Sequence, residues 1–377
     1  MPDADRSSAP YPSRANGPCS PLVLHHGALG DSVQLVAMLD ELRRRWGAAC
    51  DLVAGRVSPA LFAGLDSVRE VQVLGSRSTP YALSRRQRQL VEWMRRRGPS
   101  PCYVVERWRH PVAPWSRSTR LEWLARRAGI AAESTVTTER VIRAPLEHAV
   151  DYFVRLARLD PPALAAPFAG GSGAVRPRLA VTADEIAEGR DRLREMGWRG
   201  ESIVLFQPLS RRKKRGRWPE ERWIELLHRL RAERPRAWFG LLGGPSERAE
   251  TARLALRVSE LGVHDLAVDL PLRRLMATLT LAESLVSLDT GPAHIAAALG
   301  CPVVVLLGSA DPRRNRPLGE PGTVELVSTF GERLPLDGAE WFARHRVEAI
   351  EVDAVFAAWQ RLRFRAGSAG VATSDAS

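Results

Sequence analysis

Short apolar runs alternate with longer amphipathic stretches along most of the chain. Leu22-Val-Leu24 is one such run, and the stretch after it places Leu35, Leu39, Leu42 and Trp46 at successive intervals of 4, 3 and 4 residues. That spacing puts the four side chains on one face of an α-helix. The pattern therefore predicts a buried strand followed by a helix that packs on it.

The same rhythm continues in both halves of the chain. Further strands are expected at 51–54, 68–74, 103–105, 203–206, 238–242, 285–288 and 303–307. Further helices are expected at 82–97, 118–128, 147–159, 183–196, 219–233, 246–260, 272–281, 292–299 and 353–364. Strands that alternate with helices indicate parallel sheets with helices on both faces. The predicted fold class is α/β, with two Rossmann-like, doubly wound domains facing a cleft, where open α/β sheets bind ligands.

Length and composition set the domain boundaries. A chain of 377 residues is too long for one ordinary core, and residues 160–177 are rich in Pro and Gly, as linkers are. The expected parts are a disordered tail at 1–20, an N-terminal Rossmann-like domain at 21–160, a linker at 161–178, a C-terminal Rossmann-like domain at 179–345, a helix at 346–365 and a disordered tail at 366–377.

The remaining bulk properties indicate a globular protein in a reducing compartment. The first twenty residues hold no apolar segment typical of a signal peptide, and the longest apolar stretch, Ala293 to Leu307, is too short to span a bilayer. Four widely spaced cysteines form no C-x-x-C pair, which favours free thiols. We expect a cytoplasmic protein, with peripheral contact to the inner face of the cytoplasmic membrane left open.

A net charge of +12 raises nucleic acid, an anionic membrane or an acidic substrate as partners. Nearly all of the positive charge is arginine, so a compositional bias of the genome explains it equally well. No nucleic-acid-binding motif accompanies the charge, and we expect no nucleic acid partner.

The loop from Gly27 to Asp31 follows the first predicted strand. Gly27 and Gly30 allow a tight turn, and Asp31 falls at or near the helix N-cap. Asp31 either caps the helix or serves as a general base at the carboxyl end of the strand. The glycines do not make the G-x-G-x-x-G fingerprint of dinucleotide sites.

A basic loop follows the strand at 203–206. It runs from Ser210 through Lys213 and Lys214, the only lysines of the chain, to Arg217, and Pro219 takes the favoured first position of the next helix. Its place at the carboxyl end of a Rossmann-like strand favours phosphate binding. The alternatives are a solvated run of charge or contact with an anionic membrane or acidic acceptor.

The segment Ser287-Leu-Asp289-Thr-Gly-Pro-Ala-His294 carries the sharpest signal. Asp289, Thr290 and Gly291 form a turn into a helix that we expect to begin at Pro292. Backbone amides and the macrodipole at a helix start suit a phosphate group, the Thr290 hydroxyl adds a donor, and His294 lies one turn in. An ordinary capped helix is the alternative.

Two weaker patterns follow the next strands. In Gly243-Gly-Pro-Ser-Glu247 the glycines permit close backbone approach, and Glu247 could accept hydrogen bonds from a ribose. Residues 308–312, Gly-Ser-Ala-Asp-Pro, read as a turn that lines the ligand pocket.

Taken in order, five segments resemble glycosyltransferase family 9, the ADP-heptose:lipopolysaccharide heptosyltransferases. They are G-A-L-G-D, R-W-P-E-E-R-W, L-L-G-G-P-S-E, S-L-D-T-G-P-A-H-I-A-A-A-L-G and G-S-A-D-P, and they fall within residues 22 to 320. The resemblance implies a GT-B fold and metal-independent transfer of heptose, with inversion, onto a lipopolysaccharide core or related anionic glycan acceptor. ADP-heptose would be the co-substrate, and no other cofactor is implied. The domain at 21–160 would be the acceptor domain and the domain at 179–345 the nucleotide-sugar donor domain.

The resemblance also implies roles for single residues. Asp31 matches the general base, Glu247 the acid near the donor ribose, and Asp289, Thr290, Gly291 and His294 the contacts to the donor diphosphate and sugar. No metal is expected, since the one D-x-D string, Asp3-Ala-Asp5, lies in the polar tail.

The chain departs from the family in places. Gly216 stands where the family often has Lys, so Lys214, Arg215 or Arg217 would supply that cation, and G-S-A-D-P replaces the usual G-P-T-D-P. These changes affect the donor sugar more than the reaction type. On the acceptor side we place Gly27, Gly30, His25 (the basic residue before the loop), Arg107 and Arg109.

Three other functions are compatible with two Rossmann-like domains. A related transferase could use a different nucleotide sugar, and a paralogue could bind nucleotide sugars without turnover. An NAD-dependent oxidoreductase shares the Rossmann-like architecture, but the incomplete glycine fingerprint argues against it.

Overall fold

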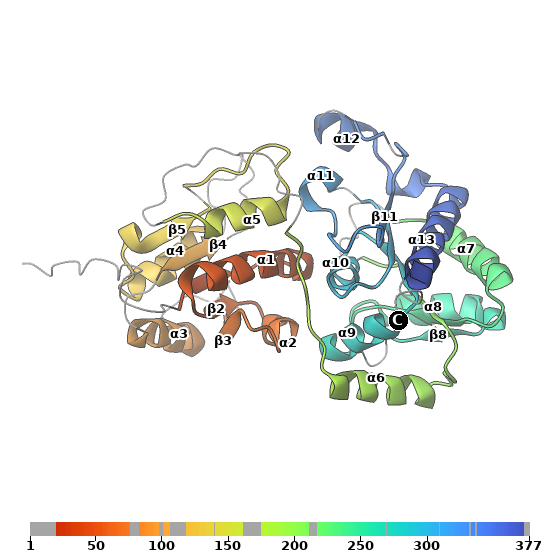
Figure 1. Ribbon diagram of the computed structural model, residues 1–377, viewed down its shortest axis with the longest axis horizontal. Coiled ribbons are helices and arrows are strands. Elements are labelled where there is room, and N and C mark those ends of the chain that lie inside the picture. Colours follow the sequence, from red (N-terminus) through yellow and green to blue (C-terminus); the bar gives the residue numbers. More distant parts are fainter. Residues whose placement is uncertain are drawn as a thin grey trace, which may run out of the picture. The chain divides into compact units, whose positions relative to one another are not determined.

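The structure is a computed structural model that describes residues 20–75, 83–97, 101–105, 118–138, 140–160, 175–210, 217–267, 270–308, 310–331, 333–335 and 338–372. Its contacts divide the chain into two compact units (Figure 1). The first unit contains residues up to 28 together with 34–175, and the second contains residues 29–33 together with 176–377.

The first unit is built on a parallel sheet of five strands in the order β3-β2-β1-β4-β5. The strands are β1 (Leu22–His25), β2 (Cys50–Ala54), β3 (Val68–Val73), β4 (Cys102–Val105) and β5 (Thr135–Thr137). Side chains alternate between the two faces of each strand, and β1, β2, β4 and β5 are buried on both faces. Continuous apolar runs such as L-V-L are the expected consequence.

Helices cover both faces of this sheet. They are α1 (Leu29–Trp46), α2 (Ser58–Phe62), α3 (Arg85–Arg96), α4 (Ser118–Arg127) and α5 (Ala149–Ala157), with a 3₁₀ turn at Ala132–Ser134. Leu22 and Leu24 pack with the apolar residues of α3 and α4 in one core. Tyr103 belongs to the other face, where its hydroxyl accepts from Trp46 Nε1 of α1 at 3.2 Å.

The second unit is built on a parallel sheet of six strands in the order β11-β10-β9-β6-β7-β8. The strands are β6 (Ile203–Gln207), β7 (Trp238–Leu241), β8 (Val263–Asp265), β9 (Ser284–Leu288), β10 (Val303–Leu306) and β11 (Val324–Val327). Counted within the unit, the order is 3-2-1-4-5-6, the dinucleotide-fold order, and the first sheet follows it through its fifth strand. The predicted α/β class with two doubly wound sheets is confirmed.

Helices also cover both faces of the second sheet (Figure 1). They are α6 (Ala183–Glu195), α7 (Glu220–Glu233), α8 (Arg248–Arg257), α9 (Leu272–Leu281), α10 (Gly291–Ala298), α11 (Pro312–Asn315), α12 (Gly338–Arg344) and α13 (Val352–Ala372), with 3₁₀ turns at Ser259–Leu261 and Val347–Ala349. Residues of α7, α8 and α13 share one core with the sheet, while α6 and α9 pack against each other. None of the helices in the described part of the chain has the length and hydropathy needed to cross a membrane.

Several predicted boundaries differ from the structure. Pro219 is the N-cap of α7 and not its first helical residue, since its ψ of 142° is not helical. Helix α10 begins at Gly291 and not at Pro292, since Thr290 is the N-cap. The last helix continues to Ala372, past the boundary expected at 365.

Three buried cysteines lie at the amino ends of strands. Cys50 begins β2, Cys102 begins β4, and Cys301 precedes β10; none is in a disulfide. Burial raises the pKa of the Cys102 and Cys301 thiols to about 12, and burial beside Asp51 also raises the pKa of the Cys50 thiol. These thiols stay protonated in the folded protein.

Candidate functional site

In each sheet the strand order reverses between two neighbouring strands, which is where open α/β sheets bind ligands. In the second unit these strands are β6 and β9, whose ends align through the pair Gln207 and Ser287. The chain continues from β6 toward Ser210 and from β9 into Asp289. The topology therefore brings the start of the basic loop and the D-T-G turn to one edge of one sheet.

The turn between β9 and α10 is held by the sheet and by its own side chains. The amide of Asp289 donates to the carbonyl oxygen of Leu306 at 3.0 Å, which extends the pairing of β9 with β10. Asp289 Oδ1 lies 3.8 Å from His294 Nε2, and both side chains are largely buried. Asp289 and His294 are thus neighbours at the start of α10.

The start of α10 has hydrogen-bond donors that no capping side chain occupies. Thr290 is the N-cap but its side chain makes no capping hydrogen bond; its hydroxyl lies 3.4 Å from Ser287 Oγ. Pro292 has no amide hydrogen, and the amide of Ala293 donates to the carbonyl oxygen of Thr290 at 3.1 Å. The groups that this helix start can offer to an anion are the Gly291 amide, the Thr290 hydroxyl and the His294 ring.

The turn after β7 is closed by Glu247. Its Oε2 accepts from the amide of Gly244 at 2.8 Å, and its own amide donates to the carbonyl oxygen of Gly244 at 2.8 Å. Gly243 has no room for a side chain, because a Cβ there would lie 2.8 Å from Thr251 Cγ2. In this structure the buried Glu247 carboxylate therefore orders the turn.

The R-W-P-E-E-R-W segment is explained largely by packing. Trp218 and Trp223 are buried and meet edge to face, with ring centroids 4.8 Å apart. Trp218 Nε1 donates to the carbonyl oxygen of Ile350 at 2.7 Å, and Arg222 binds that same oxygen. These bonds fix the start of α7 to the chain just before α13.

The basic loop is described only at its two ends. Ser210 lies at one end and Arg217 at the other, while Lys213 and Lys214 lie outside the described residues. Arg217 Nη1 is 2.6 Å from Glu250 Oε2 on α8, so Arg217 is ion-paired in this structure. No local pattern predicts this ion pair, because Glu250 lies on another helix, α8.

In the first unit the order reverses between β1 and β4, and His25 ends β1. His25 Nδ1 lies 3.0 Å from the carbonyl oxygen of Val105, and the amide of Gly27 donates to Nε2 at 3.2 Å. A carbonyl can only accept and an amide N–H can only donate, so the ring is neutral with its proton on Nδ1. His25 therefore ties the two central strands together and is not a cation. Arg107 and Arg109 lie outside the described residues.

Asp31 is the third residue of α1, inside its first turn, where a carboxylate interacts favourably with the helix dipole. Residues 29–33 belong by their contacts to the second unit. Within that unit, a Cβ on Gly30 would lie 2.8 Å from His294 Cδ2, and one on Gly291 would lie 2.8 Å from Leu29 Cδ2. Both glycines permit this close approach, which brings the backbone beside Asp31 to the start of α10.

The sequence profile of glycosyltransferase family 9 (heptosyltransferase) matches residues 121–332, more than half of the chain. The chain belongs to this family. The matched segment includes Ser210, Arg217, Glu247 and the turn from Asp289 to His294, whereas Asp31 precedes it. No curated protein sequence matched the chain.

Solved structures of the family share the fold of this glycosyltransferase. E. coli ADP-heptose lps heptosyltransferase II is 18% identical with a TM-score of 0.70, over 92% of this chain and 99% of that one. The family 9 glycosyl transferase of Veillonella parvula DSM 2008 is 15% identical with a TM-score of 0.72, over 92% and 98%. E. coli heptosyltransferase WaaC with ADP is 17% identical with a TM-score of 0.61, over 91% and 99%. The two-sheet arrangement is thus GT-B-like.

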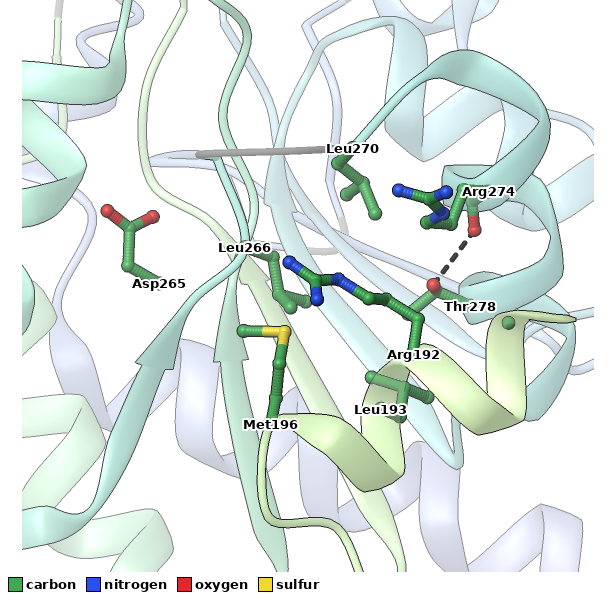
Figure 2. A pocket seen from close by; sticks show the side chains of 9 residues that line it. Arg192, Leu193, Met196, Asp265, Leu266, Leu270, Arg274 and Thr278 are labelled. Carbon is green, nitrogen blue, oxygen red and sulfur yellow. Dashed lines mark hydrogen bonds between the residues drawn. The ribbon is translucent and has the colours of Figure 1, made fainter.

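Two other features of this family 9 enzyme do not add to the site. Among the described residues no group of three or more His, Cys, Asp or Glu side chains is placed to hold a metal ion. A small pocket in the second unit lies between α6, α9 and the segment after β8 (Figure 2). Its arginines, Arg192 and Arg274, pair with Glu195 and Glu188, and none of the predicted site residues lines it.

Proposed function

We propose that this family 9 glycosyltransferase transfers a heptose from ADP-heptose, with inversion, to a hydroxyl of a lipopolysaccharide core or related anionic glycan. Family membership supports glycosyl transfer. The donor is suggested by relatives described as bound to ADP and to ADP-2-deoxy-2-fluoro heptose. The proposed co-substrate is the nucleotide sugar alone.

In the proposed reaction Asp31 is the general base. Its carboxylate takes the proton of the acceptor hydroxyl while that oxygen attacks the anomeric carbon of the donor sugar. The bond between that carbon and the diphosphate oxygen breaks with both electrons going to the oxygen, so the nucleoside diphosphate leaves from the opposite face. A single displacement of this kind inverts the anomeric centre.

The departing diphosphate gains negative charge, which the start of α10 is suited to stabilise. The Gly291 amide, the Thr290 hydroxyl and the His294 ring can all donate toward one anion, with the helix dipole behind them. In this proposal Lys213 and Lys214 add positive charge from the loop after β6, and Glu247 accepts from the donor ribose. To do so, the Glu247 carboxylate would have to give up its hydrogen bond from the Gly244 amide, or accept from the amide and the ribose together.

One observation carries the proposal. The glycine before Asp31 lies against the His294 ring, within the same unit as the D-T-G turn. A base on α1 and a phosphate-binding helix start would then act on the two ends of one transfer, with Asp31 at the attacking oxygen and α10 at the leaving group.

The test is a panel of nucleotide sugars offered with a phosphorylated lipopolysaccharide-core acceptor. We expect glycosylated product and free ADP with ADP-heptose, and an anomeric configuration opposite to that of the donor by NMR. Retention would exclude the single displacement. If only another nucleotide sugar supported turnover, the proposed mechanism would stand and the proposed donor would be wrong. The departures from the family at Gly216 and in G-S-A-D-P allow this outcome.

The same assay tests whether a metal is needed. With amides, a hydroxyl and cations available to the leaving group, we expect turnover to survive EDTA. An absolute requirement for Mg²⁺ or Mn²⁺, restored by adding the ion back, would contradict the proposed role of α10.

A further inference from the structure

A groove on the first unit runs along the open edge of its sheet, between β3 and α3. It is lined by side chains of both elements: Gln72, Val73, Arg85, Arg86, Gln89, Leu90, Trp93 and Arg96. None of them belongs to the site described above. The groove is therefore a separate feature, made from an edge strand and the helix that follows it.

Hydrogen bonds hold the polar walls of the groove in place. Glu70 of β3 accepts from Gln72 Nε2 at 2.6 Å and from Trp93 Nε1 at 3.2 Å. This joins the strand to the helix across the groove. The carboxylate of Glu70 is engaged by neutral donors and forms no ion pair with the groove arginines in the described part of the chain.

The positive charge of the groove is not balanced locally. Helix α3 contains five arginines and one glutamate, and its apolar positions face the core. Arg85, Arg86 and Arg96 are exposed, and no carboxylate among the described residues pairs with them. By contrast, Arg97 at the end of the helix and Arg69 on β3 both bind the buried carboxylate of Asp51.

Exposed apolar side chains lie beside this charge. Leu83, next to the N-cap of α3, is 77% exposed, and Trp123 of α4 is 43% exposed. Helices α3 and α4 are neighbours, joined by a hydrogen bond from Arg95 to the carbonyl oxygen of Arg127 at 2.8 Å. Cations together with exposed leucine and tryptophan on one helical layer are typical of surfaces that bind membrane interfaces.

We propose that the groove formed by β3 and α3 binds the phosphate headgroups of an anionic bilayer and docks the first unit on the membrane surface. Guanidinium groups bind phosphate with two parallel hydrogen bonds, and the exposed Arg85, Arg86 and Arg96 supply them. Leu83 would enter the interface at the end of the groove. This binding is independent of the sugar transferred and is measured without turnover.

The experiment measures partition of the full chain onto phosphatidylcholine vesicles with and without phosphatidylglycerol. We expect binding only with phosphatidylglycerol, weakened by salt as the Debye length falls from about 10 Å to about 3 Å. The triple variant Arg85→Gln, Arg86→Gln, Arg96→Gln should lose about fivefold per arginine, or about a hundredfold in total.

The matched control removes the same net charge from ion-paired arginines of the second unit: Arg192→Gln, Arg194→Gln and Arg344→Gln. We expect this control to bind like the wild type, and equal loss in both triples would overturn the assignment to this groove. Absence of a preference for phosphatidylglycerol in the wild type would overturn the proposal as a whole. Thermal melting of each variant confirms that it is folded.

A second variant separates a membrane from other polyanions. Leu83→Ser keeps the charge and removes an apolar side chain, so vesicle binding should fall about threefold or more. Binding of a single-stranded RNA oligonucleotide should be unaffected. If the arginine triple lost RNA binding while vesicle binding stayed at the wild-type level, the groove would be a nucleic-acid surface and the proposal would be wrong.

Discussion

The two units have the same strand order through five strands, yet their central strands end in different chemistry. In the first unit β1 ends at His25, whose ring nitrogens are both engaged by the backbone of Val105 and Gly27. In the second unit β9 leads into the D-T-G turn, where Thr290 caps α10 without using its side chain. One scaffold therefore builds a rigid strand junction in one half and a donor-rich helix start in the other, so function depends on the loops and not on the sheet.

The amino ends of the sheets show a second contrast. In the first unit Asp51 is fully buried, with Arg69 and Arg97 bound to it. In the second unit Glu283 binds Arg234 at 2.8 Å and Arg363 at 2.9 Å, but its side chain is 24% exposed. Each unit has an arginine-bound carboxylate at this edge, and only the first excludes water from it.

The largest expected effect concerns the division of labour between α1 and α10. Asp31→Ala should lower kcat by about 10²- to 10⁴-fold, the usual size of general-base catalysis, while donor affinity stays close to wild type. Steady-state kinetics and calorimetry with donor measure the two quantities. Asp40→Ala, on the same helix, serves as the control and should keep its turnover; wild-type kcat in the Asp31 variant would leave that residue as a structural part of the helix start.

The next largest expected effect is on stability, and it compares the buried carboxylate of Asp51 with the partly exposed carboxylate of Glu283. Asp51→Asn leaves two arginines without their buried partner and should lower the free energy of unfolding of the first unit by about 3 kcal/mol. Glu283→Gln should cost about 1 kcal/mol, because water screens that group. Urea denaturation of both variants measures the difference, and equal losses would show that burial does not distinguish the two edges.

An intermediate effect is expected at the start of α10. Thr290→Val keeps the shape of the side chain and removes its donor, so affinity for the nucleoside diphosphate should fall about tenfold or more, with little change for the bare nucleoside. Lys213→Ala with Lys214→Ala should behave in the same way. If the lysine variant binds the diphosphate normally in calorimetry, the loop does not contact phosphate and only the turn remains.

The smallest expected effect is a pH dependence confined to the second unit. Hydrogen bonds from Arg273 and Thr182 lower the pKa of Glu185 to about 2. A lowered pKa adds stability above the unfolded value near 4.5, and that stability is lost as the pH falls through about 2. Glu185→Gln should therefore be less stable than wild type by up to about 1 kcal/mol at neutral pH and match it near pH 2. A constant difference across this range, in denaturation monitored at each pH, would assign the loss to packing.

The central strands were predictable, and so was the six-residue edge strand β3, whereas the three shorter edge strands were missed. Continuous apolar runs identified β1, β4, β6, β9 and β10. The missed strands β5, β8 and β11 are three or four residues long and lie at sheet edges. Short edge strands need no long apolar run, so V-H-D at Val263–Asp265 has no hydrophobic pattern to detect.

For the site, sequence motifs predicted where residues lie in the fold better than they predicted which residues contact each other. The place of Asp289–His294 after a central strand followed from one local pattern, because strand, turn and helix start are consecutive. The pairing of Arg217 with Glu250 and the neutral state of His25 depend on residues far along the chain. Such contacts depend on the order of the strands in the sheet, because that order decides which distant segments become neighbours. A single sequence does not show the strand order. The roles of Asp31, Thr290 and Glu247 stay predictions.

The buried thiols allow local unfolding of each unit to be measured separately. Cys50 and Cys102 lie in the first sheet and Cys301 beside the second, all inaccessible and held protonated by burial. An alkylating reagent reacts with thiolates, so each should be modified only when its own strand separates from the core. With Cys19 replaced by Ser, the labelling rates of Cys102 and Cys301 would give the opening free energies of the two halves separately, and a bound donor should slow the second rate without slowing the first.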